Sequence, residues 1–100
     1  MEKKTTITKD GTKIESYSLS EEQHNIAVRL VTENLRKIDN YTLEEVEDEE
    51  MVNIWIADAY AEGEEDYVDF LRNAIVKGAT IYTLKSHCGW AQPIGEVVVY

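Results

Sequence analysis

Hydrophobic side chains recur every three to four positions between residues 21 and 38, which predicts an amphipathic helix over that range. Ser20 and Gln23 have the spacing of a capping box at its start, and Asn40 is a stop signal beyond its end. The hydrophobic positions that define this face are Ile26, Ala27, Leu30, Val31, Leu35 and Ile38.

A similar stripe predicts a second helix that starts near Glu64 and ends at Lys77 and Gly78, a basic last turn followed by a C-terminal glycine. The stripe consists of Tyr67, Phe70, Leu71, Ala74 and Ile75. It indicates one buried face.

Residues 51–61 are apolar on nearly all sides, so periodicity alone allows either a buried helix or a buried strand. The length of the run, its three alanines and a capping box formed by Thr42 and Glu45 favour a helix. This helix would have an acidic, exposed first half and a buried second half that includes Tyr60, and Gly63 would end it.

Two hairpins flank the helices in the predicted order. Residues 5–8 and 12–17 surround Asp10-Gly11, a type I′ turn signal that places Ile7 opposite Ile14. Residues 80–85 and 96–100 are rich in strand-forming side chains, and Pro93 and Gly95 separate the second strand from the loop over residues 86–93.

The expected fold is a small α+β single domain over residues 1–100, in the order ββαααββ. It divides into an N-terminal hairpin (1–18), three helices (20–78) and C-terminal strands (80–100). The simplest architecture is an antiparallel sheet with the helices packed on one face. Whether the two hairpins share one sheet stays open at this point.

Charge is concentrated in one quarter of the chain. The protein carries a formal charge of −10, and residues 41–66 contain eleven acidic residues and no Lys or Arg. If this segment were one helix, it would span roughly 39 Å. It would then carry a charge about every 3.5 Å, close to the spacing of phosphates along one DNA strand. The segment is therefore either a solvated face that aids solubility or a surface kept negative for a basic partner.

We favour the second interpretation, with Trp90 as an additional contact because exposed tryptophan is enriched in binding hot spots. Trp90 could instead fold back over the sheet, whereas Trp55 is expected in the core. The candidate partner-binding residues are Glu44, Glu45, Glu47, Asp48, Glu49, Glu50, Glu62, Glu64, Glu65, Asp66 and Trp90.

Catalytic and metal-binding motifs are not found. His24, His87 and Cys88 lack the spacing of a zinc site, and the acidic run lacks the glycine of an EF-hand loop. We therefore expect no enzyme activity, cofactor or metal site. A net negative charge also argues against direct binding to nucleic acid or to an anionic membrane.

The leading hypothesis is a cytoplasmic protein that binds and inhibits or modulates a basic, nucleic-acid-processing protein such as a nuclease. In size and charge, though in no motif, the chain is similar to phage-encoded anti-restriction and anti-CRISPR proteins. One alternative is an acidic adaptor or oligomer-forming module whose partner has no nucleic-acid role. Another is a small-ligand-binding protein that uses the loop over residues 86–93.

Overall fold

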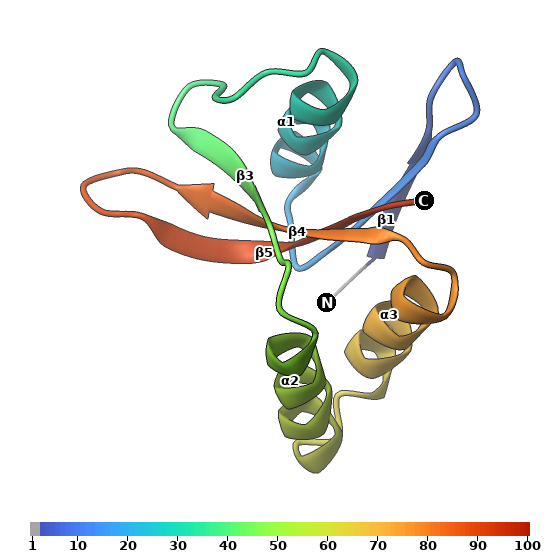
Figure 1. Cartoon of the computed structure of the whole chain (residues 1–100). Helices are drawn as coiled ribbons and strands as arrows, with labels where there is room; N and C mark the ends of the chain where they lie inside the picture. Colours follow the sequence, from blue (N-terminus) through green and yellow to red (C-terminus); the bar gives the residue numbers. More distant parts are fainter. Residues whose placement is uncertain (1–2) are drawn as a thin grey trace.

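The computed structural model describes residues 3–100, which form a five-stranded sheet and three helices (Figure 1). The elements are β1 (Lys3–Ile7), β2 (Lys13–Tyr17), α1 (Glu21–Thr32), β3 (Tyr41–Glu45), α2 (Glu49–Ala61), α3 (Glu65–Val76), β4 (Thr80–Ser86) and β5 (Gln92–Val99). The order is ββαβααββ, so the α+β class is confirmed and the expected order ββαααββ is wrong.

The two hairpins belong to one sheet, which settles the question that the sequence left open. The strands lie in the order β1-β2-β5-β4-β3, and every neighbouring pair is antiparallel. Pairing of β2 with β5 joins the N-terminal hairpin to the C-terminal hairpin. The C-terminal strand is therefore the centre of the sheet.

Helices cover both faces of this sheet, in contrast to the predicted single face. Figure 1 shows α1 on one side of the strands and the α2–α3 hairpin on the other. Val97 on β5 packs with α1, whereas the next residue, Val98, packs with α2 and α3, and both are fully buried. Successive side chains of a strand point to opposite faces, so a run of valines requires a covering layer on each face.

Residues 41–45 form the edge strand β3 and not the start of a helix. Leu43 lies opposite Leu84 of β4, and α2 begins only at Glu49, with Asp48 as its N-cap. The Asp48 side chain accepts a hydrogen bond from the backbone N–H of Glu50. Thr42 and Glu45 have capping-box spacing, but pairing with β4 determines the local structure, because a motif of two residues is weaker than a five-residue ladder.

Helix α1 begins as predicted and ends six residues early. The capping box between Ser20 and Gln23 is present. After Thr32 the chain turns at Asn34, which has φ +51°, and the backbone N–H of Leu35 bonds back to the carbonyl of Leu30. Asparagine tolerates this left-handed conformation, so it ends the helix where periodicity alone would continue it.

The first hairpin has a three-residue loop and not a type I′ turn. Only Gly11 has positive φ, and the hydrogen bonds fit a type I turn followed by a left-handed glycine. This shifts the register by one residue: Thr6 lies opposite Ile14, and Ile7 lies opposite Lys13. Ile7 is therefore exposed, and the predicted pairing of Ile7 with Ile14 is wrong.

The C-terminal hairpin is longer than predicted, because β5 runs through Pro93 and Gly95. Pro93 is accommodated beside a β-bulge near Leu84 and Lys85. Gly95 lies against β2: a Cβ atom there would come within 2.6 Å of the main-chain oxygen of Tyr17. The predicted loop shortens to residues 87–91. The predicted end of the preceding helix, α3, at Lys77 and Gly78 is confirmed.

Candidate functional site

The acidic residues of the candidate surface lie on several elements and do not form one helix. Glu44 and Glu45 end β3, Glu47 and Asp48 lie in the link, and the rest lie on α2, the α2–α3 turn and the first turn of α3. All of the predicted acidic site residues are exposed. The phosphate-like spacing expected of a continuous helix is therefore absent, although the high density of negative charge remains.

Two of these acids have local structural partners. Lys85 forms an ion pair with Glu44 at 2.7 Å, and Asp48 caps α2. Glu49 and Glu50 occupy the first turn of α2, where the helix dipole favours negative charge. Glu44 and Asp48 are four residues apart, as are Glu45 and Glu49, but neither pair shares a helix, so no i,i+4 repulsion arises between them.

The acidic surface, defined here as residues 45–50 and 58–66, borders exposed hydrophobic side chains of α2. Met51 is 45% exposed and Ile54 is 58% exposed. Val52 and Ile56 are buried as predicted, but Tyr60 is 67% exposed, contrary to the prediction. An amphipathic helix packed on a sheet hides its apolar residues, so an apolar residue on the outer side of α2 is available to a partner.

A cleft of about 910 Å³ lies between the α2–α3 turn and the end of the sheet at β5. Trp55, Tyr17 and Tyr67 contribute aromatic rings, and the rings of Tyr17 and Tyr67 lie 5.2 Å apart. Six carboxylates line the cleft, and none of the described lining residues is Lys, Arg or His. The carboxylates belong to Asp58, Glu62, Glu64, Glu65, Asp66 and Glu96. The cleft thus combines apolar walls with an uncompensated negative charge.

Glu96 is the innermost of these acids, because it lies on the central strand β5 and not on a surface turn. Its carboxylate accepts a hydrogen bond from the hydroxyl of Tyr67. Burial raises the pKa of Glu96 above its usual value, and the Tyr67 hydrogen bond offsets this only in part. Burial, together with the hydrogen bond to Glu96, also raises the pKa of Tyr67.

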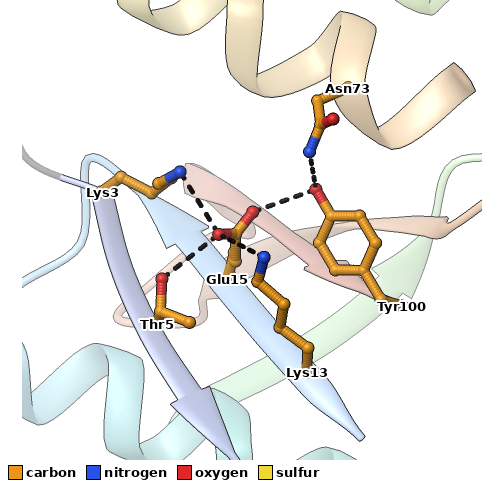
Figure 2. Close-up of polar contacts among 6 residues, drawn as sticks. All are labelled: Lys3, Thr5, Lys13, Glu15, Asn73 and Tyr100. Carbon is orange, nitrogen blue, oxygen red and sulfur yellow. Dashed lines mark hydrogen bonds and ion pairs between the residues drawn. The ribbon is translucent and has the colours of Figure 1, made fainter. Parts of the chain in front are cut away.

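Glu15 is a second enclosed carboxylate on the same face of the sheet, and two lysines form ion pairs with it. The Nζ atoms of Lys3 and Lys13 lie 3.3 and 3.5 Å from its Oε2, and the hydroxyl groups of Thr5 and Tyr100 donate hydrogen bonds to the carboxylate (Figure 2). Burial acts to raise the pKa of Glu15, but the Tyr100 hydrogen bond and the two lysines outweigh it, so the pKa lies below its usual value. Glu96 has no equivalent of these lysines among the described residues that line the cleft.

Trp90 lies apart from this cleft, on the loop that joins β4 to β5. It is 78% exposed, so it does not fold back over the sheet. The loop is attached to the strand edge at His87, whose backbone N–H donates to the Asn40 carbonyl at 2.7 Å. The His87 ring bonds the hydroxyl of Thr42 at 2.6 Å, and Cys88 is exposed. Trp90 is thus presented outward, as its predicted role requires.

Sequence analysis did not identify Tyr17, Trp55, Asp58, Tyr67 or Glu96 as site residues. Their convergence depends on how the α2–α3 hairpin lies over β2 and β5. One signal was present: Glu96 is an acidic residue at the start of a run of valines, inside a predicted strand. A carboxylate in such a position is costly to bury without a partner, and this marks it for attention.

No family model matches the chain, and neither does any curated protein or solved structure. Within residues 3–100, no group of three or more His, Cys, Asp and Glu residues is arranged to hold a metal ion. The same part of the chain has no helix that is long and apolar enough to cross a membrane. The geometry and charge of the acidic surface and its cleft are therefore the basis for a functional proposal.

Proposed function

We propose that this protein binds a basic protein through its acidic surface and inhibits or modulates that partner. The supporting observation is the uncompensated charge around α2 and the first turn of α3. Between residues 41 and 66, as described, the only ion pair is the one that Glu44 makes with Lys85. Unpaired exposed carboxylates at this density attract a cationic surface and increase the rate of encounter with it.

A nucleic-acid-processing enzyme is the class of partner that fits this surface best. Such enzymes bind phosphates with exposed lysine and arginine residues in a groove. A protein that occupies the groove with its own carboxylates keeps the nucleic acid out, and inhibition follows without catalysis. The chemistry requires only that negative groups cover the cationic residues, so the irregular spacing found here is compatible with it.

The exposed apolar residues of α2 supply contact area as well as charge. Met51 and Ile54 would bury apolar surface against the partner, which contributes about 25 cal/mol per Å². A second copy of this chain is a poor occupant of the same surface, because two acidic rims would then face each other. The surface therefore favours a heterologous, basic partner.

The test compares three forms of the tagged full-length protein as baits in host lysate. Wild type is compared with Glu45→Gln/Glu47→Gln/Glu49→Gln, which removes three charges from the acidic surface at exposed positions outside the cleft. The matched control, Glu21→Gln/Glu22→Gln/Asp39→Asn, removes three exposed charges on and just beyond α1. The lysate is treated with nuclease, and captured proteins are identified by mass spectrometry at low and high salt.

We expect wild type and the control to capture the same basic nucleic-acid enzyme, which elutes as salt rises. The acidic-surface variant should capture at least tenfold less of it, and wild type should inhibit the purified enzyme. Equal capture by all three forms would contradict the proposal. A salt-resistant partner with no nucleic-acid role would instead support the adaptor alternative, in which Met51 and Ile54 dominate.

A further inference from the structure

We propose that the cleft between the α2–α3 turn and β5 binds an arginine side chain presented by an extended segment of the partner. This inference rests on the proposed function and deepens it, because it assigns one chemical group to one place on the acidic surface. Three features of the cleft carry it: its charge, its aromatic walls and the position of Glu96.

The negative charge of the cleft favours a cationic ligand. All six charged residues that line it are acids, and they belong to three separate elements and a turn. Asp58 and Glu62 come from the end of α2, and Glu96 lies at the sheet. A cationic group in the cleft would therefore face carboxylates both at the rim and at the floor, which gives complementarity in depth as well as at the surface.

The aromatic walls favour a guanidinium over an ammonium group. Trp55, Tyr17 and Tyr67 border the cleft. A guanidinium ion is planar and weakly hydrated, so it stacks on aromatic rings while it donates paired hydrogen bonds to a carboxylate. An ammonium ion is compact and strongly hydrated, so it loses more hydration free energy when it leaves water for a partly apolar cleft.

The guanidinium group of the bound arginine would lie against the carboxylate of Glu96. Glu96 and Glu15 are on the same face of adjacent strands, with Tyr17 opposite Glu96 and Val98 opposite Glu15 in the ladder. The fold supplies Glu15 with two lysines, whereas among the described residues it supplies Glu96 with the Tyr67 hydroxyl and no cation. An enclosed carboxylate without a cation destabilises the free protein, and an arginine from outside would complete the same type of cluster that Lys3 and Lys13 complete at Glu15.

The dimensions of the cleft suit a side chain together with some of its flanking backbone. Its volume of about 910 Å³ is larger than one side chain needs and is within the range of ordinary ligand sites. The wall formed by Pro93, Ile94 and Gly95 offers apolar contact to the methylene groups of the arginine.

The experiment titrates the full-length protein with an end-blocked Gly-Arg-Gly-Arg-Gly peptide at low salt. Matched peptides carry lysine or the uncharged analogue citrulline in place of arginine. Calorimetry gives the affinities, and amide and indole NMR signals locate the site. The two tryptophans serve as internal probes, because Trp55 lines the cleft and Trp90 does not.

We expect the arginine peptide to shift the Trp55 indole signal and the amides of residues 58–67 and 94–96, with no shift at Trp90. The lysine peptide should bind at least threefold more weakly, and the citrulline peptide should not bind. Glu96→Gln keeps an oxygen that can accept from Tyr67, so it should fold, yet it should weaken binding of the arginine peptide at least tenfold. The double variant Asp58→Asn/Glu62→Gln changes only exposed positions of the cleft, and it should also weaken binding of the arginine peptide.

The matched control is Glu47→Gln/Glu49→Gln, which lies on the acidic surface outside the cleft and should weaken peptide binding less than threefold. Equal effects of the cleft variants and this control, or equal binding of arginine and lysine peptides, would overturn the inference. The peptides would then bind by general attraction to the acidic surface. Capture of the basic partner tests the proposed function separately, because it responds to Glu45, Glu47 and Glu49 whether or not the cleft takes an arginine.

Stability provides an independent check on the role of Glu96. Since the pKa of Glu96 is raised on folding, its charge destabilises the protein at neutral pH, and Glu96→Gln should increase the stability of the unliganded protein. Glu15→Gln should decrease it, because the pKa of Glu15 is lowered on folding. A loss of stability in Glu96→Gln would show that Glu96 is a structural residue and would overturn its assignment as the cation partner.

Discussion

His24 is buried between α1 and the first hairpin, and both of its ring nitrogens are occupied. Nδ1 lies 2.7 Å from the hydroxyl of Ser16, and Nε2 lies 2.8 Å from the hydroxyl of Thr6. The neutral ring donates at one nitrogen and accepts at the other, and the two hydroxyl groups can match either arrangement. This side chain therefore joins one helix to two strands through a buried contact with Ser16 and a partly buried contact with Thr6.

Burial lowers the pKa of His24, and the nearby positive charge of Lys4 lowers it further. The unfolded chain therefore binds a proton at a higher pH than the folded protein does. The contribution of His24 to stability should be constant above the unfolded pKa and should fall as the pH drops through about 6.5 toward the folded pKa. Each unit by which the folded pKa lies below the unfolded value contributes about 1.4 kcal/mol to this loss.

We predict that His24→Gln will flatten the pH dependence of the free energy of unfolding between about pH 8 and 5. Glutamine can donate to one hydroxyl and accept from the other, but it does not titrate. Urea denaturation of wild type and the variant at several pH values measures the effect, and their difference cancels the carboxylates that both share. Parallel curves for the two proteins would show that His24 does not account for the pH dependence.

At the scale of elements, strand β5 depends on a residue that sequence patterns count as a strand breaker. Gly95 is buried in the ladder with β4, and Leu19 and the Tyr17 carbonyl fill the space where a side chain would begin. A larger residue would separate β5 from the chain that leaves β2. The glycine thus permits the close approach that joins the two hairpins into one sheet.

Gly95→Ala should therefore destabilise the protein by about 2–3 kcal/mol, as expected for overpacking against backbone that cannot move aside. The matched control is Gly11→Ala, where a Cβ meets nothing within 4 Å and only the positive φ of 87° is unfavourable. The control should cost about 1–2 kcal/mol. Chemical denaturation of both variants gives the comparison, and a smaller loss at Gly95 than at Gly11 would show that the close contact relaxes readily.

At the scale of the whole molecule, structural charge and unpaired charge occupy different places. The lysines at Glu15 and the ion pair of Arg29 with Glu33 lie on β1, β2 and α1. The acidic surface gathers around α2 and the start of α3, where none of its acids forms an ion pair with another described residue. The neighbouring Glu44 pairs with Lys85, and the guanidinium of Arg72 lies 6.0 Å from the centre of the Tyr60 ring. With a net charge of −10, the folded protein repels itself most strongly on that side.

We predict that raising sodium chloride from about 20 mM to 300 mM will stabilise the unliganded protein by about 1 kcal/mol, since screening weakens repulsion among exposed charges. This corresponds to a rise in Tm of roughly 4–8 °C for a domain of this size. Glu45→Gln/Glu47→Gln/Glu49→Gln should show a smaller rise. Thermal denaturation of both proteins at the two salt concentrations measures the effect. An equal rise in Tm for wild type and the variant would indicate that the acidic surface is not the source of the repulsion.

Several local sequence signals were confirmed, although the end of α1, which the turn at Asn34 sets, was not predicted. The capping box at Ser20 and the glycine stop at Gly78 were predicted and are confirmed. Of the predicted stripe on α3, Phe70, Leu71 and Ala74 are buried, but Ile75 is 47% exposed. Exposure of the acidic run and burial of Val52 and Ile56 were predicted as well. Each of these follows from spacing within about one or two helical turns, which the sequence displays directly.

Predictions that depended on strand pairing and register were wrong for a common reason. Thr42 and Glu45 resemble a helix start, but the edge of β4 pairs with them. Ile7 and Ile14 match across a two-residue turn, but a longer loop shifts the register by one position and exposes Ile7. The energy of a strand lies in its ladder, and a sequence does not show which ladder a strand will join.

The sequence by itself determined the α+β composition, the start of α1, the end of α3, and the concentration of charge between residues 41 and 66. Tertiary structure alone decided that β5 is central, that helices cover both sheet faces, and that Glu96 meets Tyr67 beneath the acids of the α2–α3 turn. The physical reason is range: caps and periodicity act over a few residues, whereas layers and clefts arise from contacts between segments far apart in the chain.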